Sequence, residues 1–216
     1  MENDTNAVSF HKTRIAPTPS GYLHLGNALS FIITAALAKK ANSKLLLRID
    51  DLDRGRTQKK YVEDIFETLH FLGIEWAEGP KDYNEYEQVY SQTHRMHLYQ
   101  TALQQLKNDK KVYACACSRL QLTSAQVCFC MKKNIPLDTP GVSWRLITDA
   151  AQLLTINTAK QKVISTLPSA MQGFIVRNKS GFPSYQLSSL IDDEHFGIDA
   201  IVRGEDLWDS SLAQQY

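Results

Sequence analysis

Long apolar runs are missing from this sequence of 216 residues. The most apolar stretch, residues 28–38, includes Ser30 and Thr34 and is too short to cross a bilayer, so it is typical of a buried helix. The amino terminus, Met1-Glu2-Asn3-Asp4, is acidic and lacks the apolar core of a signal peptide. We therefore expect a cytoplasmic protein without a membrane segment.

A net charge is also nearly absent, because 24 Lys and Arg face 23 Asp and Glu. This excludes a protein that binds nucleic acid through its overall charge, so any such contact must use a local patch. Residues 107–133 carry six basic side chains against one acidic, and residues 182–216 carry seven acidic against one basic. A content of 43% hydrophobic and 22% charged residues excludes a disordered chain, a collagen and a coiled coil.

The first half of the chain alternates between two kinds of pattern. Residues 11–16 and 44–49 predict short strands, and residues 57–72 predict an amphipathic helix. Residues 27–40 predict a helix that is apolar on nearly all sides, which we expect inside the domain. Strand, helix, strand, helix is typical of an α/β protein with a parallel sheet.

The second half is less regular. Residues 92–107 predict a helix, residues 143–147 and 173–177 predict strands, and residues 178–181 suit a hairpin turn. An irregular stretch rich in Pro, Thr and Asn separates the helix from these strands. The α/β alternation resumes through residues 198–202.

The strongest local pattern is a proline-stiffened loop that enters a helix through His24, Gly26 and Asn27. A helix start offers unpaired N–H groups and a positive dipole end, which suit a phosphate. Gly26 permits close approach of a ligand, and His24 can donate a hydrogen bond to developing negative charge. Taken alone, a histidine before a helix is more often a structural cap.

Three blocks carry a resemblance to a known family. Residues 14–27 resemble the His-x-Gly-His signature of class I aminoacyl-tRNA synthetases in its glutamyl form. Residues 47–54 resemble the family's Leu-Arg-Ile-Glu-Asp-x-Asp-Arg block, and residues 181–206 resemble its Tyr, Asp-Asp and Val-Ile-Arg-Gly-Glu-Asp block. Their order identifies the chain as a member of the family. They do not separate glutamyl-tRNA synthetases from the short paralogues that glutamylate queuosine in an aspartate tRNA.

The resemblance implies a Rossmann-like parallel-sheet nucleotide-binding domain with an inserted acceptor-binding subdomain. The expected halves of the catalytic domain are residues 1–107 and 173–216, and the insertion is residues 108–172. ATP, with Mg, would lie at the carboxyl ends of the strands, over the helix start.

The resemblance also implies an enzyme, a ligase that joins glutamate to tRNA through glutamyl-adenylate. The acceptor is either the acceptor stem of the tRNA or its queuosine-bearing anticodon arm, and we expect a monomer. The ATP-facing and catalytic residues are His24, Gly26 and Asn27, with Asn27 in place of the family's second His. The competing hypothesis is a non-catalytic glutamate- or tRNA-binding relic.

Seven positions match the family's glutamate pocket: Arg14, Ala16, Thr18, Asp50, Tyr185, Ser189 and Arg203. Arg14 and Arg203 would contact the carboxylates of glutamate, because a guanidinium binds a carboxylate through two nitrogens. Asp50 stands where the family has Glu and would bind the ammonium group through a shorter side chain. Without the resemblance, residues 50–54 read as a solvated loop and residues 192–194 as a charged helix end.

The cysteines form two close pairs: Cys115, Cys117, Cys128 and Cys130. Four thiolates can hold a structural zinc ion, and reduced, partly buried cysteines are the alternative. Related synthetases begin a zinc site with the same Tyr-x-Cys-x-Cys, here from Tyr113, and the queuosine-type paralogues complete theirs with a Tyr and a Cys. The flanking basic residues suit either acceptor-stem phosphates or a plain solvated face: Lys110, Lys111, Arg119, Lys132 and Lys133.

One family feature is missing from the sequence. No Lys-Met-Ser-Lys-Ser signature follows Arg203, and no Lys follows Lys179. There is also no anticodon-binding domain. We expect either a fragment, cut before the signature, or a natural truncation that activates glutamate poorly.

Overall fold

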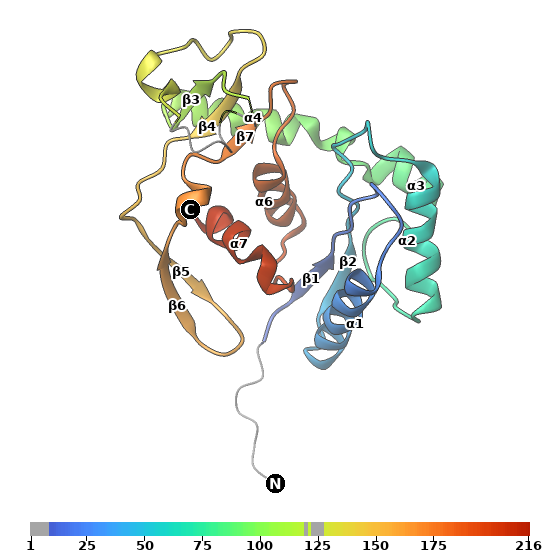
Figure 1. Ribbon diagram of the computed structural model, residues 1–216. Coiled ribbons are helices and arrows are strands. Elements are labelled where there is room, and N and C mark those ends of the chain that lie inside the picture. Colours follow the sequence, from blue (N-terminus) through green and yellow to red (C-terminus); the bar gives the residue numbers. More distant parts are fainter. Residues whose placement is uncertain (1–8, 119–120, 122–127) are drawn as a thin grey trace. The chain divides into compact units, whose positions relative to one another are not determined.

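The computed structural model describes residues 9–118, 121 and 128–216. The chain divides into two compact units (Figure 1). The first comprises Met1–Met96 and Asp192–Glu205, and the second comprises His97–Ile191 and Asp206–Tyr216. The expected insertion, residues 108–172, falls within the second unit. No helix in the described part of the chain is long and apolar enough to cross a membrane.

A parallel strand pair forms the centre of the first unit. β1 (Lys12–Ile15) pairs with β2 (Lys44–Leu47), with Arg14 opposite Leu46, and α1 (Leu25–Lys40) makes the crossover between them. A parallel bridge from Leu46 to Glu78 continues the pairing beyond β2. These elements confirm the predicted α/β alternation and the parallel sheet.

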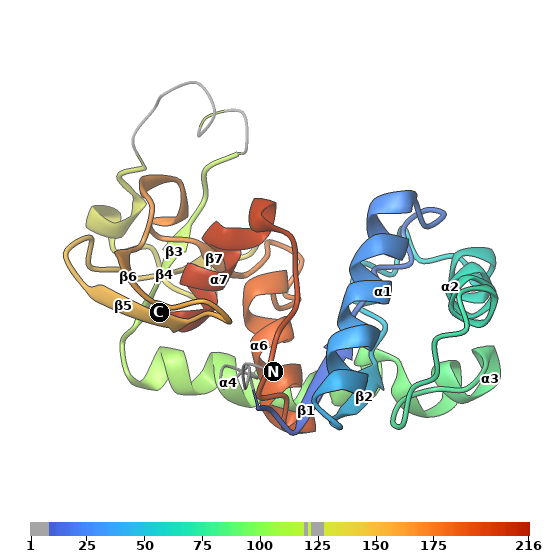
Figure 2. The ribbon, with the colours of Figure 1, turned by 90° about the horizontal axis from the view of Figure 1, so that it is seen from below.

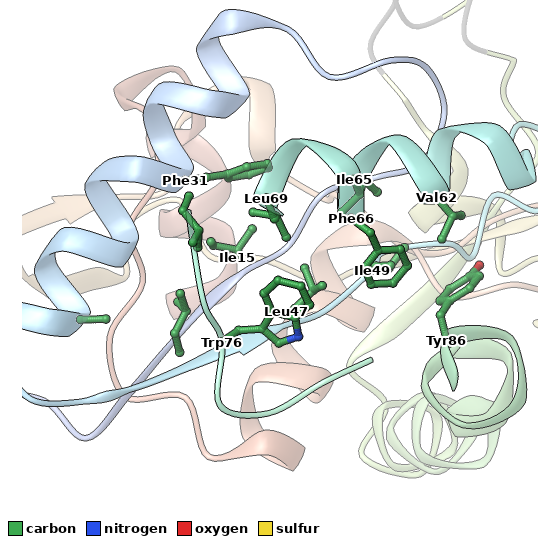
Figure 3. Close-up of a cluster of buried hydrophobic side chains, with 13 residues drawn as sticks. Ile15, Phe31, Leu47, Ile49, Val62, Ile65, Phe66, Leu69, Trp76 and Tyr86 are labelled. Carbon is green, nitrogen blue, oxygen red and sulfur yellow. The ribbon is translucent and has the colours of Figure 1, made fainter. Parts of the chain in front are cut away.

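The core of the first unit packs α2 (Lys59–Phe71) against the strands. α2 confirms the predicted amphipathic helix and buries one apolar stripe, and Figure 3 shows these side chains over Leu47 and Ile49: Val62, Ile65, Phe66 and Leu69. Burial of each such side chain contributes about 1.5–3 kcal/mol. After the helix ends, Gly73 adopts a φ of 65°, which a residue without a Cβ accommodates most easily.

The prediction that α1 lies inside the domain is wrong. The buried residues of α1 are Phe31, Thr34 and Ala38, at helical spacing along one stripe. Its other face is exposed and apolar, with Leu25 89% exposed, and includes Leu29, Ile32, Ile33 and Leu37. Apolar composition on every side does not reveal how much of a helix its neighbours cover, because one stripe is enough to anchor it.

Short helical pieces follow in the first unit. α3 (Tyr83–Glu85) leads into a π-helical turn (Tyr86–Tyr90) and a 3-10 turn (Gln92–Arg95). The expected helix over residues 92–107 is therefore a 3-10 turn followed by α4 (Met96–Asn108). Gln92 and Arg95 are buried in the 3-10 turn, where both side chains bind the same acidic residue, described below.

The second unit contains an antiparallel sheet in the order β3-β4-β7. These strands are β3 (Val112–Cys115), β4 (Ser143–Leu146) and β7 (Ile175–Arg177). β4 and β7 lie in the predicted strand regions, whereas β3 was not assigned from the sequence. α4 and α6 (Tyr185–Phe196) contribute to the apolar cluster of this unit: Leu103, Val112, Ala114, Val142, Trp144, Val176 and Leu187.

A hairpin of β5 (Leu153–Asn157) and β6 (Lys162–Thr166) lies next to α7 (Trp208–Gln215), as Figures 1 and 2 show. The sequence analysis assigned no element to these residues. Only Leu154 of the two strands is fully buried, beside Leu212. The hairpin therefore contributes little to the core by itself, although Ile156 also packs, partly buried, against this cluster.

Residues 198–202, all of which the structure describes, form no strand. The carboxylate of Asp199 instead accepts the backbone N–H groups of His11 at 3.0 Å and Lys12 at 2.8 Å. A side chain thus takes up donors at the start of β1 that a neighbouring strand would otherwise use. Two further 3-10 turns in the second unit are Cys130–Lys133 and Ser169–Met171, and a third, Glu205–Leu207, precedes α7.

Candidate functional site

His24 is the N-cap residue of α1. Its Nδ1 accepts the N–H of Gly26 at 3.1 Å, and Asn27 Oδ1 accepts the N–H of His24 at 3.1 Å. This reciprocal pair is a capping box. A Cβ on Gly26 would lie 3.0 Å from the His24 ring, so glycine keeps the ring in place against the helix start. The three expected ATP-facing residues therefore form one local unit.

The start of α1 is compatible with an anionic ligand. The first turn carries no acidic side chain, and His24, Leu25 and Gly26 are exposed. The helix dipole favours negative charge at this end. Ala16 and Thr18, expected in the glutamate pocket, precede α1 in the loop after β1, where Ala16 is half-buried and Thr18 is exposed.

Arg14 of β1 is buried and already bound to a carboxylate of the protein. Its Nε donates to Asp193 Oδ1 at 3.0 Å and its Nη2 to Asp193 Oδ2 at 3.5 Å. Asp193 lies on α6 and is also buried. The cation expected to meet the substrate is thus held by a charge-assisted contact within the first unit.

Arg48, which follows β2, binds two carboxylates. Its Nε and Nη2 donate to Asp50 at 2.7 and 3.1 Å, and its Nη1 donates to Asp193 at 2.6 Å. Burial by itself lowers the pKa of the guanidinium, but the charges of Asp50 and Asp193 outweigh it and raise that pKa above its ordinary value. Burial raises the pKa of Asp50 in spite of Arg48. The expected ammonium ligand is therefore a buried, paired carboxylate.

A second buried pair lies beside the first. Arg95 donates to Asp192 through Nε at 2.8 Å and Nη2 at 3.1 Å, and Gln92 Nε2 donates to Asp192 at 2.8 Å. Burial alone would raise the pKa of Asp192, but the hydrogen bonds and charge of Arg95 hold it below its usual value. The acidic pair that could be read as a charged helix end is thus fully engaged inside the first unit.

Asp51 is likewise fully occupied. Its carboxylate accepts the hydroxyls of Tyr86 at 2.7 Å and Ser91 at 2.6 Å, and the N–H of Gln92 at 2.8 Å. Burial and the neighbouring carboxylate raise the pKa of Tyr86. The reading of residues 50–54 as a solvated loop therefore holds only from Asp53 onward, where the side chains are exposed.

The remaining expected substrate residues lie in both units. Arg203 is half-buried in the loop before the Glu205–Leu207 turn, in the first unit. Tyr185, which is 42% exposed, and Ser189, which is buried, belong to the part of α6 in the second unit. Sequence reasoning missed Arg48 and Arg95. A signal existed for Arg48, since it stands between Leu47 and Ile49 in a run of otherwise apolar, buried residues.

The four cysteines come together at the end of β3 and the start of the Cys130–Lys133 turn. The sulfur of Cys117 lies 3.9 Å from that of Cys128 and 3.5 Å from that of Cys130. The sulfurs of Cys115 and Cys128 lie 3.6 Å apart. All four sulfurs lie within 4.8 Å of one another. A tetrahedral ion with metal–sulfur bonds of about 2.3 Å requires sulfur separations of about 3.8 Å. The cluster therefore fits a single metal ion.

All four cysteines are free. The backbone of Ala116 and the neighbouring thiols outweigh burial and lower the pKa of Cys130 to about 7, whereas burial and the neighbouring thiols raise the pKa of Cys117 to about 12 and also raise that of Cys128. Because a metal binds the thiolate, a metal ion in the cluster would release protons from these thiols. Lys132 and Lys133 follow within the turn and are exposed, whereas Arg119 lies outside the described residues.

Comparisons with known proteins identify the family of this chain. A family model for the catalytic domain of class I tRNA synthetases for Glu and Gln matches residues 11–135. The chain is 32% identical to a glutamyl-Q tRNA(Asp) synthetase of Symbiobacterium thermophilum, over 93% of this chain and 68% of that protein. It is also 32% identical to glutamate–tRNA ligase 2 of Nitrosococcus oceani, over 90% of this chain and 45% of that protein. The chain belongs to this class I synthetase family.

Solved structures support the same fold. A glutamate tRNA ligase from Elizabethkingia meningosepticum, crystallised with its amino acid, superposes with a TM-score of 0.77 at 22% identity. The match covers 94% of this chain and 45% of that one. The chain thus spans about two thirds of the glutamyl-Q synthetase and less than half of the glutamate–tRNA ligases that it resembles.

Proposed function

We propose that this chain is the glutamate- and ATP-binding part of an enzyme that activates glutamate and transfers it to tRNA. The observation that carries the proposal is the position of Arg14 and Asp50. Both are buried, at or just beyond the carboxyl ends of two neighbouring parallel strands, where α/β proteins bind their ligands. A guanidinium and a carboxylate there match the carboxylate and ammonium groups of an amino acid.

In the proposed reaction, an α-carboxylate oxygen of glutamate attacks the α-phosphorus of ATP. A bond to the bridging oxygen breaks, pyrophosphate leaves, and glutamyl-adenylate remains. A hydroxyl of the RNA then attacks the acyl carbon and releases AMP. Catalysis requires positioning and charge stabilisation rather than a protein nucleophile.

In this proposal, one group of residues binds ATP and another binds glutamate. The capped helix start of His24, Gly26 and Asn27 faces the phosphates of ATP, which enters with Mg. Ala16, Thr18, Tyr185 and Ser189 line the glutamate pocket, and Arg14 and Arg203 bind its carboxylates.

We propose the queuosine-bearing anticodon arm of a tRNA as the acceptor, with the acceptor stem as the alternative. The short run from Cys130 to Arg145 favours the first. Transfer assays with an aspartate tRNA that carries queuosine and with a glutamate tRNA separate the two.

We propose zinc as the ion of the four-cysteine cluster. The sulfur spacing suits its tetrahedral coordination, and the site is closed by four protein ligands, as structural zinc sites are. We place this site in an inserted subdomain, residues 108–172, between catalytic halves 1–107 and 173–216. We further propose a cytoplasmic monomer.

A stable glutamyl-adenylate analogue, glutamyl-sulfamoyl-adenosine, tests the proposal without requiring the activation step. Calorimetry should show that it binds more tightly than glutamate or ATP alone, and more tightly than its glutaminyl counterpart. Arg203→Ala should abolish the preference for the glutamyl form, because leaving a carboxylate unpaired in a partly dry pocket costs about 2–5 kcal/mol. Equal affinity for both analogues would refute the assignment. Binding without any ATP–pyrophosphate exchange in a longer natural chain would favour the non-catalytic relic.

A further inference from the structure

Two residues connect the expected ligands of glutamate. Asp193 and Arg48 lie in a continuous series of contacts that runs from Arg14 through Asp193 and Arg48 to Asp50. We call these four residues the charge quartet. All are buried, with exposed fractions of 5% for Arg14 and Asp193, 2% for Arg48 and 8% for Asp50.

A single oxygen joins the two cations of the charge quartet. Oδ1 of Asp193 accepts both Arg14 Nε at 3.0 Å and Arg48 Nη1 at 2.6 Å. The remaining nitrogens of Arg48 form a two-point contact with Asp50. Because the guanidinium is planar and rigid, this geometry fixes the orientation of Asp50 relative to Asp193, and through Asp193 that of Arg14.

The charge quartet is electrically balanced, with two cations and two anions. Outside the charge quartet, Asp192 Oδ2 lies 3.8 Å from Arg48 Nε, and Arg95 already binds Asp192. Removal of the negative charge at Asp193 would therefore leave an excess positive charge in the buried region next to Asp50. Such a charge attracts a carboxylate and repels an ammonium group, with little screening by water.

We propose that Asp193 is a positioning residue that makes this site prefer a ligand carrying an ammonium group beside its carboxylates. It does so by holding Arg14 and by neutralising the side of Arg48 that faces away from Asp50. The inference rests on the proposed function, since it takes glutamate as the ligand of Arg14 and Asp50. In this inference Asp193 does not contact glutamate itself. It binds Arg14 directly and reaches Asp50 through Arg48.

The test compares glutamate with glutarate, which has the same two carboxylates and no ammonium group. Asp193→Asn keeps the shape of the side chain and removes its charge. Calorimetry should show glutamate affinity falling about tenfold, because the excess positive charge opposes the ammonium group that only glutamate carries, while glutarate affinity changes by less than about threefold. A role in folding alone would weaken both ligands together.

Asp51→Asn is the matched control. Asp51 is an equally buried carboxylate in the same segment, but its partners are Tyr86, Ser91, Gln92 and Arg54 rather than members of the charge quartet. It should lower the melting temperature and leave the ratio of the two affinities unchanged. If Asp193→Asn does not fold, Asp193→Ser provides the second variant, because it removes the same negative charge with a smaller polar side chain. It should show the same loss of preference.

The outcomes separate the two levels of the argument. Wild-type binding of glutamate with an unchanged glutamate-to-glutarate ratio in Asp193→Asn would overturn this inference and leave the proposed function standing. Equal weakening of both ligands would also overturn it, by reducing Asp193 to a structural residue. No binding of glutamate by the wild-type chain would refute the proposed function, and the inference with it.

Discussion

Replacement of Arg95 by Met should strongly destabilise the first unit. The substitution removes a two-point contact with Asp192, at 2.8 and 3.1 Å, and a hydrogen bond to the carbonyl of Tyr90 at 2.8 Å. Asp192 has no exposed surface, so its charge cannot recover these interactions from water. Breaking a buried ion pair by removing one partner costs about 3–5 kcal/mol. For a chain of this size that loss lowers the melting temperature by roughly 6–20 °C.

The assay is thermal and urea unfolding followed by circular dichroism, with Arg56→Met as the control. Arg56 also pairs with an aspartate, Asp53, at 2.6 Å, but both side chains are more than half exposed. Exposed pairs contribute about 0–1 kcal/mol, so the control should barely move the transition. A double change of Arg95 and Asp192 to Met and Leu should recover part of the loss, because no buried charge then remains unpaired. If Arg95→Met were as mild as Arg56→Met, the reasoning about this buried pair would be refuted.

Three further changes have defined expectations. Asp192 has a pKa below its ordinary 3.8 in the folded chain, so its charge stabilises the fold above pH 3.8, and this contribution is lost as the pH falls through the folded pKa. In Asp192→Asn the free energy of unfolding should therefore depend less on pH in this acid range. The same acid dependence in the variant and the wild type would contradict the assignment. Metal analysis should find about one zinc per chain, lost in a Cys115→Ser, Cys117→Ser double variant, and a well-folded wild-type chain without metal would contradict the zinc site. Gly26→Ala should lower the free energy of unfolding by about 0.5–2 kcal/mol and weaken ATP binding, because the new Cβ displaces the capping ring of His24. Unchanged unfolding and unchanged ATP titrations would show that the cap contributes to neither.

Regular apolar spacing was the feature that sequence reasoning used most reliably. The stripe of α2 and the pair Tyr99 and Leu103 of α4 are buried where a period of 3.6 residues places them. The β5–β6 hairpin escaped prediction because it buries one leucine of its own and depends on α7, distant in sequence, for its packing. Residues 92–107 have the apolar spacing of one continuous helix, and this spacing gives no sign of the 3-10 turn of Gln92–Arg95. The conformation of that turn brings two side chains to Asp192.

The candidate site shows a similar division. The sequence motifs identified Arg14, Asp50 and the His24 cap, and the close spacing of the cysteines anticipated their cluster. What no local pattern contains is the pairing of Arg14 and Arg48 with Asp193, which stands 179 and 145 positions away along the chain. Pairing at that distance depends on the fold, so the motif residues could be recognised without revealing that they are already bound to one another.

That prior pairing has a consequence for how the proposed site would bind a zwitterion. Arg14 and Asp50 lose their water on folding rather than on binding, and their partners hold them in place before the ligand arrives. An incoming ammonium and carboxylate then meet oriented charges of the protein, which need little reorganisation. The cost of assembling those charges falls on the stability of the fold, where buried ion pairs are weakly favourable at best. Loss of a partner in the charge quartet should therefore affect both the stability of the fold and the ligand preference. Loss of Arg95, which reaches Arg48 through Asp192, should affect stability more than ligand preference.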